Sequence, residues 1–145
     1  MQLTSSAFEH DASMPSKYAC DGQGVNPPLS WSGVPKETQT LVLTVDDPDA
    51  PDGVFVHWIV WNISPKLKGI TEGKVPPGAV EGRNDFGKRE YGGVCPPRDE
   101  HHYFFKLYAL DIELRIPEIS NKETLEEEMV GHVLERAELV GRYAR

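Results

Sequence analysis

Several apolar or alternating runs along the chain predict β-strands. Residues 29–32 (LSWS) alternate apolar and polar positions as a half-buried strand does, and residues 40–45 (TLVLTV) are apolar and β-branched enough for an interior strand. Residues 54–63 (VFVHWIVWNI) are apolar on both faces, which is typical of a strand buried on both sides. Residues 103–110 (YFFKLYAL) are the last such run, and a weak alternation over 3–8 predicts a short edge strand.

The segment 64–98 has little regular patterning and is rich in Gly and Pro. So long a loop inside a compact domain is expected to carry a function or to contain short strands. Within it, residues 82–87 (GRNDFG) predict a tight turn held by Asn and Asp side chains.

In the C-terminal part of the chain, the spacing of apolar residues changes from that of strands to that of a helix. Ser120 to Glu123 have the spacing of a capping box, and apolar residues then recur at helical intervals with glutamates opposite them. We therefore expect one amphipathic helix, whose apolar positions are Leu125, Met129, Val130, Val133, Leu134, Ala137 and Val140. Strands followed by one helix predict a mainly β fold, a two-sheet antiparallel β-sandwich with a C-terminal α-helix. No repeat or linker divides the chain, so residues 1–145 are expected to form a single domain.

Charge and composition narrow the class of partner. The chain has 145 residues and a formal net charge of -8, which argues against nucleic acid or an anionic membrane surface as a partner. It shows neither a signal-peptide pattern nor a run long enough to span a bilayer, so we expect a cytoplasmic location. Cys20 and Cys95 form no CxxC motif; we favour two separate buried thiols, with a disulfide as the alternative.

The acidic loop at residues 44–52 (TVDDPDAPD) concentrates more candidate chemistry than any other stretch. Asp47 and Asp49 are two residues apart, so in an extended segment their carboxylates would point the same way, roughly 6.5 Å apart, as a shared acidic site. Pro48 and Pro51 make the loop rigid. The other two aspartates of the loop, at 46 and 52, are assigned a structural role in the turn.

The histidines are the second source of candidate chemistry. His57 lies inside the most apolar run and needs a hydrogen-bond partner, which is either a carboxylate of the acidic loop or a backbone carbonyl. His101 and His102 point to opposite faces of a strand, so only one of them can share a pocket with His57. Tyr103 lies on the same face as His101, so we expect these two to form the pair and His102 to be solvated.

Ordered motifs along the chain resemble those of one known family. DPDAP (47–51), HW (57–58), NDFG (84–87), CPP (95–97), HHYFF (101–105) with YALD (108–111), and AELVGRY (137–143) resemble the phosphatidylethanolamine-binding proteins, also called Raf kinase inhibitor-like proteins, in their short bacterial and archaeal form. The resemblance covers nearly the whole chain and implies a β-sandwich with a small anion-binding pocket at one end. By motif match, the ligand-binding residues would be Asp47, Asp49, Pro51, His57, Pro96, Pro97, His101 and Tyr103.

The chain departs from the family pattern at two positions. His102 stands where the family usually has arginine, so any ion pair of that arginine is expected to be lost or weakened. Val94 precedes Cys95 where proline is expected, which loosens the predicted rigidity of that loop.

The resemblance implies a binding or regulatory protein without a cofactor. Family members are similar in binding phosphate, acetate or phosphoryl headgroups, and some inhibit kinases or serine proteases. Because carboxylates repel phosphate, we expect the aspartates either to raise the pKa of the histidines, so that one or both are cationic, or to face the ammonium group of a zwitterionic ligand.

Two other function classes stay open. One is a metal-assisted or acid/base hydrolase using His57, His101 and Asp47 or Asp49, although no nucleophile or metal motif is evident. The other is a protease inhibitor that acts through an exposed loop and does not use the pocket.

Overall fold

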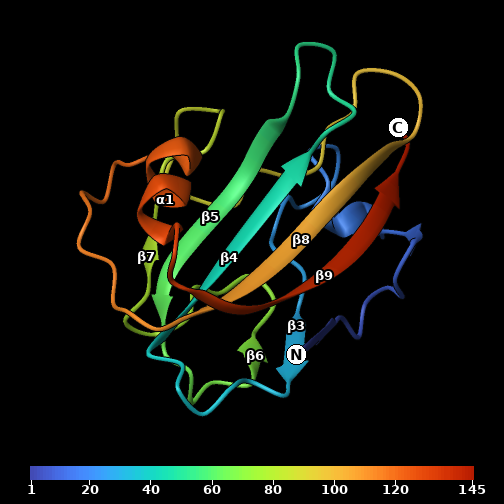
Figure 1. Ribbon diagram of the computed structural model, residues 1–145. Helices are drawn as coiled ribbons and strands as arrows, with labels where there is room; N and C mark the ends of the chain where they lie inside the picture. The colour runs from blue at the N-terminus through green and yellow to red at the C-terminus, as the bar shows by residue number, and fades with distance from the viewer.

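The strands form two sheets in the computed structural model, which describes all of residues 1–145 (Figure 1). The larger sheet has six strands in the order β2-β9-β8-β4-β5-β7, and the smaller has the order β1-β3-β6. Neighbouring strands are antiparallel except the short β2–β9 pair, which is parallel. The mainly β, two-sheet prediction is confirmed. The elements are β1 (Gln2–Thr4), β2 (Ala12–Ser13), the 3-10 helix η1 (Ser16–Tyr18), β3 (Leu29–Ser32), β4 (Thr40–Asp47), β5 (Phe55–Ile63), β6 (Gly69–Ile70), β7 (Val80–Glu81), β8 (His101–Leu110), α1 (Lys122–Met129) and β9 (Val133–Tyr143).

The apolar strands predicted from the sequence lie at the centre of the larger sheet. Every residue of β4 is buried, because β5 and β8 flank it and both of its faces are covered. Leu41, Leu43 and Val45 face the core between the two sheets, where Trp31 of β3 packs. Val42 belongs instead to a second apolar cluster under α1. Burial on both faces explains why β4 and β5 read as nearly continuous apolar runs.

The C-terminal helix is much shorter than predicted. Asn121 caps α1 by accepting a hydrogen bond from the Thr124 amide at 3.1 Å, and the helix ends at Met129. Gly131, with a φ of 82°, turns the chain, and β9 then runs antiparallel to β8 as the long red strand of Figure 1. The apolar residues of 133–143 fit period two as well as a helical period, and the ten-residue partner strand β8 decides between them.

The Gly- and Pro-rich segment 64–98 contains two short strands, β6 and β7. This agrees with the expectation that so long a loop would contain short strands. Its GRNDFG turn is held as predicted, because Asn84 accepts from the amides of Phe86 and Lys88, each at 3.0 Å. The Asn84 amide group also donates to the carbonyl of Glu90 at 2.7 Å. The turn is therefore fixed against the start of β5, where Asp85 accepts from the Val56 amide at 2.7 Å.

Cys20 and Cys95 form a disulfide, so the expectation of two separate thiols is wrong. Their Cα atoms lie 5.4 Å apart although the residues are 75 positions apart in sequence. The Cys20 amide donates to the Val94 carbonyl at 3.0 Å, which aligns the two loops. Because disulfides are rare in the cytosol, the cytoplasmic location stays a prediction. None of the helices has the length and apolar character of a membrane span.

Candidate functional site

A small pocket lies where three strands of the larger sheet meet at one end. β4 ends at Asp47, which is paired with Phe55 at the start of β5, and β8 begins at His101 beside them. Because β4 runs antiparallel to both neighbours, its last residue lies beside their first residues. The pocket has a volume of about 260 Å³ and is lined by Asp47, Ala50, Pro51, Phe55, His57, Phe86, Cys95 and Pro97.

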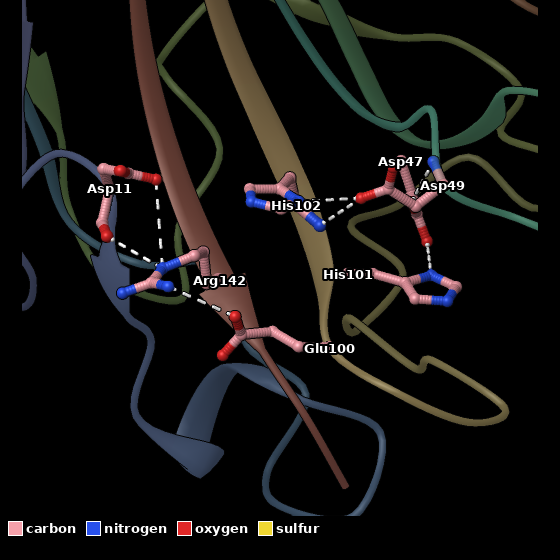
Figure 2. Close-up of polar contacts among 7 residues, drawn as sticks. All are labelled: Asp11, Asp47, Asp49, Glu100, His101, His102 and Arg142. Atoms are coloured by element: carbon pink, nitrogen blue, oxygen red, sulfur yellow. Dashed lines mark hydrogen bonds and ion pairs between the residues drawn. The ribbon is translucent and has the colours of Figure 1, made fainter.

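A buried hydrogen bond to the Asp47 carboxylate fixes the orientation of His101. Its Nδ1 lies 2.6 Å from Oδ2 of Asp47, and the two side chains are only 7% and 5% exposed (Figure 2). The other Asp47 oxygen accepts a hydrogen bond from the Asp49 amide at 2.8 Å. Both carboxylate oxygens are engaged, so Asp47 presents little free negative charge to a ligand, while Nε2 of His101 is not used in the pair.

Asp49 turns away from Asp47, and the expected shared acidic site does not form. Its Oδ2 accepts from the His102 amide at 2.8 Å and lies 2.9 Å from Nδ1 of the same residue (Figure 2). The hydrogen bonds from His102 lower the pKa of the Asp49 carboxyl. The alternation argument fails because the strand ends at Asp47, and the turn redirects the next side chains.

His102 lies on β8 with its side chain 42% exposed, so the expectation of a solvated loop residue is only partly correct. At this position the imidazole of His102 contacts the carboxylate of Asp49 at 2.9 Å.

His57 takes a backbone carbonyl as its partner, the second of the two alternatives considered. Its Nδ1 lies 2.8 Å from the Gly92 oxygen. Since a carbonyl only accepts, Nδ1 carries the proton and Nε2 of the neutral ring is an acceptor. Burial lowers the pKa of His57, and the Gly92 carbonyl and the Asp47 charge oppose this only in part. The expectation of a raised pKa is therefore wrong for His57.

Tyr103 carries a buried hydroxyl that makes no hydrogen bond of good geometry with protein atoms, although the Cys95 backbone and the Asp47 carboxylate lie near it. The residue is fully buried, and its ring centroid lies 5.4 Å from that of His57 and 6.5 Å from that of His101. Burial, reinforced by the nearby Asp47 carboxylate, raises the pKa of the Tyr103 phenol above its ordinary value. The group therefore stays protonated and is available to donate a hydrogen bond.

The structure brings together most of the predicted site residues. Pro51, His57, Pro97 and Asp47 line the pocket; His101 and Tyr103 pack against them, and Pro96 is buried next to Cys95. Of the predicted site residues, Asp49 contacts His102 and does not line the pocket.

Four lining residues are not among the predicted ligand-binding residues: Ala50, Phe55, Phe86 and Cys95. Phe55 is two residues from His57 and on the same face of its strand, and the other three lie inside the quoted motifs. Strand alternation with His57 could therefore have identified Phe55, and membership of the motifs could have identified the other three residues.

No group of three or more His, Cys, Asp or Glu side chains in the chain has an arrangement that could hold a metal ion. His57 and His101 are both near the pocket, but Asp47 is committed to His101 and Asp49 to His102. The hydrolase alternative stays a prediction.

The chain is similar to known proteins over nearly its whole length. A family model described as phosphatidylethanolamine-binding protein matches residues 4–144. A UPF0098 protein of Methanothermobacter thermautotrophicus is 47% identical over 150 residues, covering 100% of this chain and 99% of the relative. A relative in Chlamydia trachomatis, also described as a UPF0098 protein, is 47% identical over 150 residues, covering 100% of this chain and 99% of its own length.

Solved structures show the same fold. The crystal structure of a putative phosphatidylethanolamine-binding protein homolog from Chlamydia trachomatis superposes with a TM-score of 0.95 at 46% identity, covering 99% of this chain and 97% of that one. YbcL of Escherichia coli, described as a new member of the mammalian PEBP family, gives a TM-score of 0.93 at 33% identity, covering 99% and 98%. This chain therefore belongs to the phosphatidylethanolamine-binding protein family.

Proposed function

We propose that the protein binds a small phosphorylated or carboxylated group in this pocket and regulates or inhibits a kinase or a serine protease that carries such a group. The observation that supports the proposal most directly is the buried Tyr103 hydroxyl beside His57 and His101, which makes no hydrogen bond of good geometry although the Cys95 backbone and the Asp47 carboxylate lie near it. A buried donor without a partner costs about 1–3 kcal/mol, and a ligand oxygen would remove that cost.

The other polar groups complement an acid. His101, once protonated, donates through Nε2 while Asp47 holds Nδ1. Nε2 of neutral His57 accepts a hydrogen bond, which suits the hydroxyl of a monoprotonated phosphate. Phe55 and Phe86 make the walls largely apolar, and a low local dielectric strengthens each polar contact.

Calorimetric titration with phosphate, acetate and phosphoethanolamine tests the proposal. Because both Asp47 oxygens are engaged, we expect Asp47→Asn to weaken all three ligands alike, by releasing His101. A loss confined to phosphoethanolamine would instead support the zwitterion hypothesis, in which Asp47 faces the ammonium group. Asp52→Asn, at an exposed position of the same loop, is the control. Absence of binding by the wild type at millimolar ligand would contradict the proposal.

The regulatory role is tested separately. Chymotrypsin- or elastase-type proteases, and a panel of kinases, are titrated with the wild type and with His57→Ala. Inhibition that is lost in the variant supports action through the pocket. Inhibition by both proteins would favour the alternative of an exposed inhibitory loop.

A further inference from the structure

The disulfide lies beside the pocket, and one of its two cysteines is open to solvent. Cys95 is one of the residues that line the pocket, together with Pro97. Cys95 itself is half-buried, whereas its partner Cys20 is exposed on the neighbouring loop. A thiol in solution can therefore reach the bond through Cys20, and the bond that it would break holds a wall of the pocket.

The segment 95–99, which contains this wall, has few other links to the protein. None of its amides or carbonyls enters a backbone–backbone hydrogen bond. Before the segment, the Val94 carbonyl accepts from the Cys20 amide at 3.0 Å. After it, Glu100 lies 3.2 Å from Nη1 of Arg142 (Figure 2). Between these two points, the disulfide is the only covalent or backbone-hydrogen-bonded link of the segment to another part of the chain.

The position of this segment affects the groups that would hold a ligand. Pro97 lines the pocket, and the Cys95 backbone lies near the Tyr103 hydroxyl. If the segment moves away, the pocket loses part of its wall and water reaches the hydroxyl. A hydrogen bond from that hydroxyl to a ligand is then weaker, because the site is no longer shielded from solvent.

The charge next to Cys95 favours opening of the bond in one direction. Nη1 of Arg145 donates to Sγ of Cys95 at 3.8 Å. A neighbouring arginine stabilises a cysteine thiolate. In thiol–disulfide exchange, the sulfur whose thiolate is more stable leaves faster. Attack on the exposed Cys20 with departure of Cys95 is therefore the favoured direction.

We propose that a dithiol reductant opens the Cys20–Cys95 bond and thereby releases the segment 95–99 and weakens ligand binding in the pocket, a regulation that rests on the proposed function. One thiolate of the dithiol bonds to Sγ of Cys20, the Cys20–Cys95 bond breaks, and its electron pair leaves on Sγ of Cys95. The second thiolate of the dithiol then attacks the mixed disulfide and frees Cys20. The dithiol supplies two electrons and two protons and ends as a disulfide, while both cysteines end as thiols.

Calorimetric titration with phosphate of the oxidised protein, and of protein kept reduced by dithiothreitol, tests the effect on binding. Reduction should raise the Kd for phosphate about tenfold, as expected if the released segment keeps its position about a tenth of the time. The double variant Cys20→Ser, Cys95→Ser should bind like the reduced protein and should not respond to dithiothreitol. It therefore controls for effects of the reductant itself. Arg145→Gln should slow the reduction about threefold without changing the phosphate affinity of the oxidised protein.

Limited trypsin digestion measures release of the segment without any ligand. Arg98 is exposed within the segment, and a protease cuts such a site when the backbone around it opens locally. Cleavage after Arg98, identified by fragment mass, should be about tenfold faster in the reduced protein. Cleavage after Lys74, an exposed site outside the segment, should keep its rate and thus exclude general unfolding.

The two measurements separate this proposal from the proposed function. If reduction leaves either the phosphate Kd or the cleavage after Arg98 unchanged, the regulation by the disulfide is overturned. If the oxidised protein binds no phosphate, the proposed function is contradicted, and the cleavage rates still decide whether the disulfide holds the segment in place.

Discussion

Replacing Tyr103 with Phe should change ligand affinity and folding stability in opposite directions. The Tyr103 hydroxyl is proposed to bind the ligand, but its burial costs free energy in the free protein. The residue is fully buried, and its hydroxyl makes no hydrogen bond of good geometry with the nearby Cys95 backbone or Asp47 carboxylate. Removing it deletes a desolvated polar group and leaves the ring contacts with His57 and His101 in place. We therefore expect Tyr103→Phe to raise the free energy of unfolding and to lower the affinity for phosphate.

The magnitudes follow from the burial. Deleting an unsatisfied buried hydroxyl should stabilise the fold by about 1–2 kcal/mol. For a chain of 145 residues, that corresponds to a rise in Tm of about 3–6 °C. The lost hydrogen bond to a charged ligand is worth about 1.5–3 kcal/mol, or about 10- to 150-fold in Kd.

Calorimetry in the absence and presence of phosphate measures both effects. Tyr91→Phe is the matched control, since the Tyr91 hydroxyl is also buried but donates to the Tyr18 carbonyl at 2.9 Å. That variant should lose about 1 kcal/mol of stability and keep its affinity. If Tyr103→Phe were destabilised as much as Tyr91→Phe, the hydroxyl would have a partner in the free protein and the reasoning would fail. Unchanged phosphate affinity would refute its role in binding.

Two further predictions concern stability. Burial lowers the pKa of His57 in the folded state, so on acidification the unfolded chain binds a proton at this histidine before the folded chain does. The stability that neutral His57 contributes is therefore complete above about pH 6.5. It is lost as the pH falls toward the pKa of His57 in the folded state. His57→Asn keeps a donor for the Gly92 carbonyl, so its unfolding free energy should fall less between about pH 7 and 5 than that of the wild type; an equal slope in urea titrations would contradict this. The double variant Cys20→Ser, Cys95→Ser should lose about 2–4 kcal/mol in urea unfolding, because the disulfide closes a long loop, and an unchanged midpoint would show that the backbone contacts of the two loops suffice.

Local patterns in the sequence determined much of the fold and of the pocket. The apolar runs located β3, β4, β5 and β8, because burial on one or both faces leaves a periodicity that needs no knowledge of neighbours. The same alternation placed His101, and not His102, toward the pocket with Tyr103. These features depend only on side-chain direction within one strand.

Tertiary contacts decided what local patterns left ambiguous. Residues 133–143 are a strand because β8 offers a full-length ladder, although their apolar spacing also fits a helix. Asp47 faces His101 and Asp49 faces His102 because β4 ends between them. The partner of His57 comes from a carbonyl 35 residues away, and the disulfide joins loops 75 residues apart. The sequence by itself determined strands β3, β4, β5 and β8 and the residue types at the site. Which polar groups pair with each other depends on contacts between distant segments that carry no local signal.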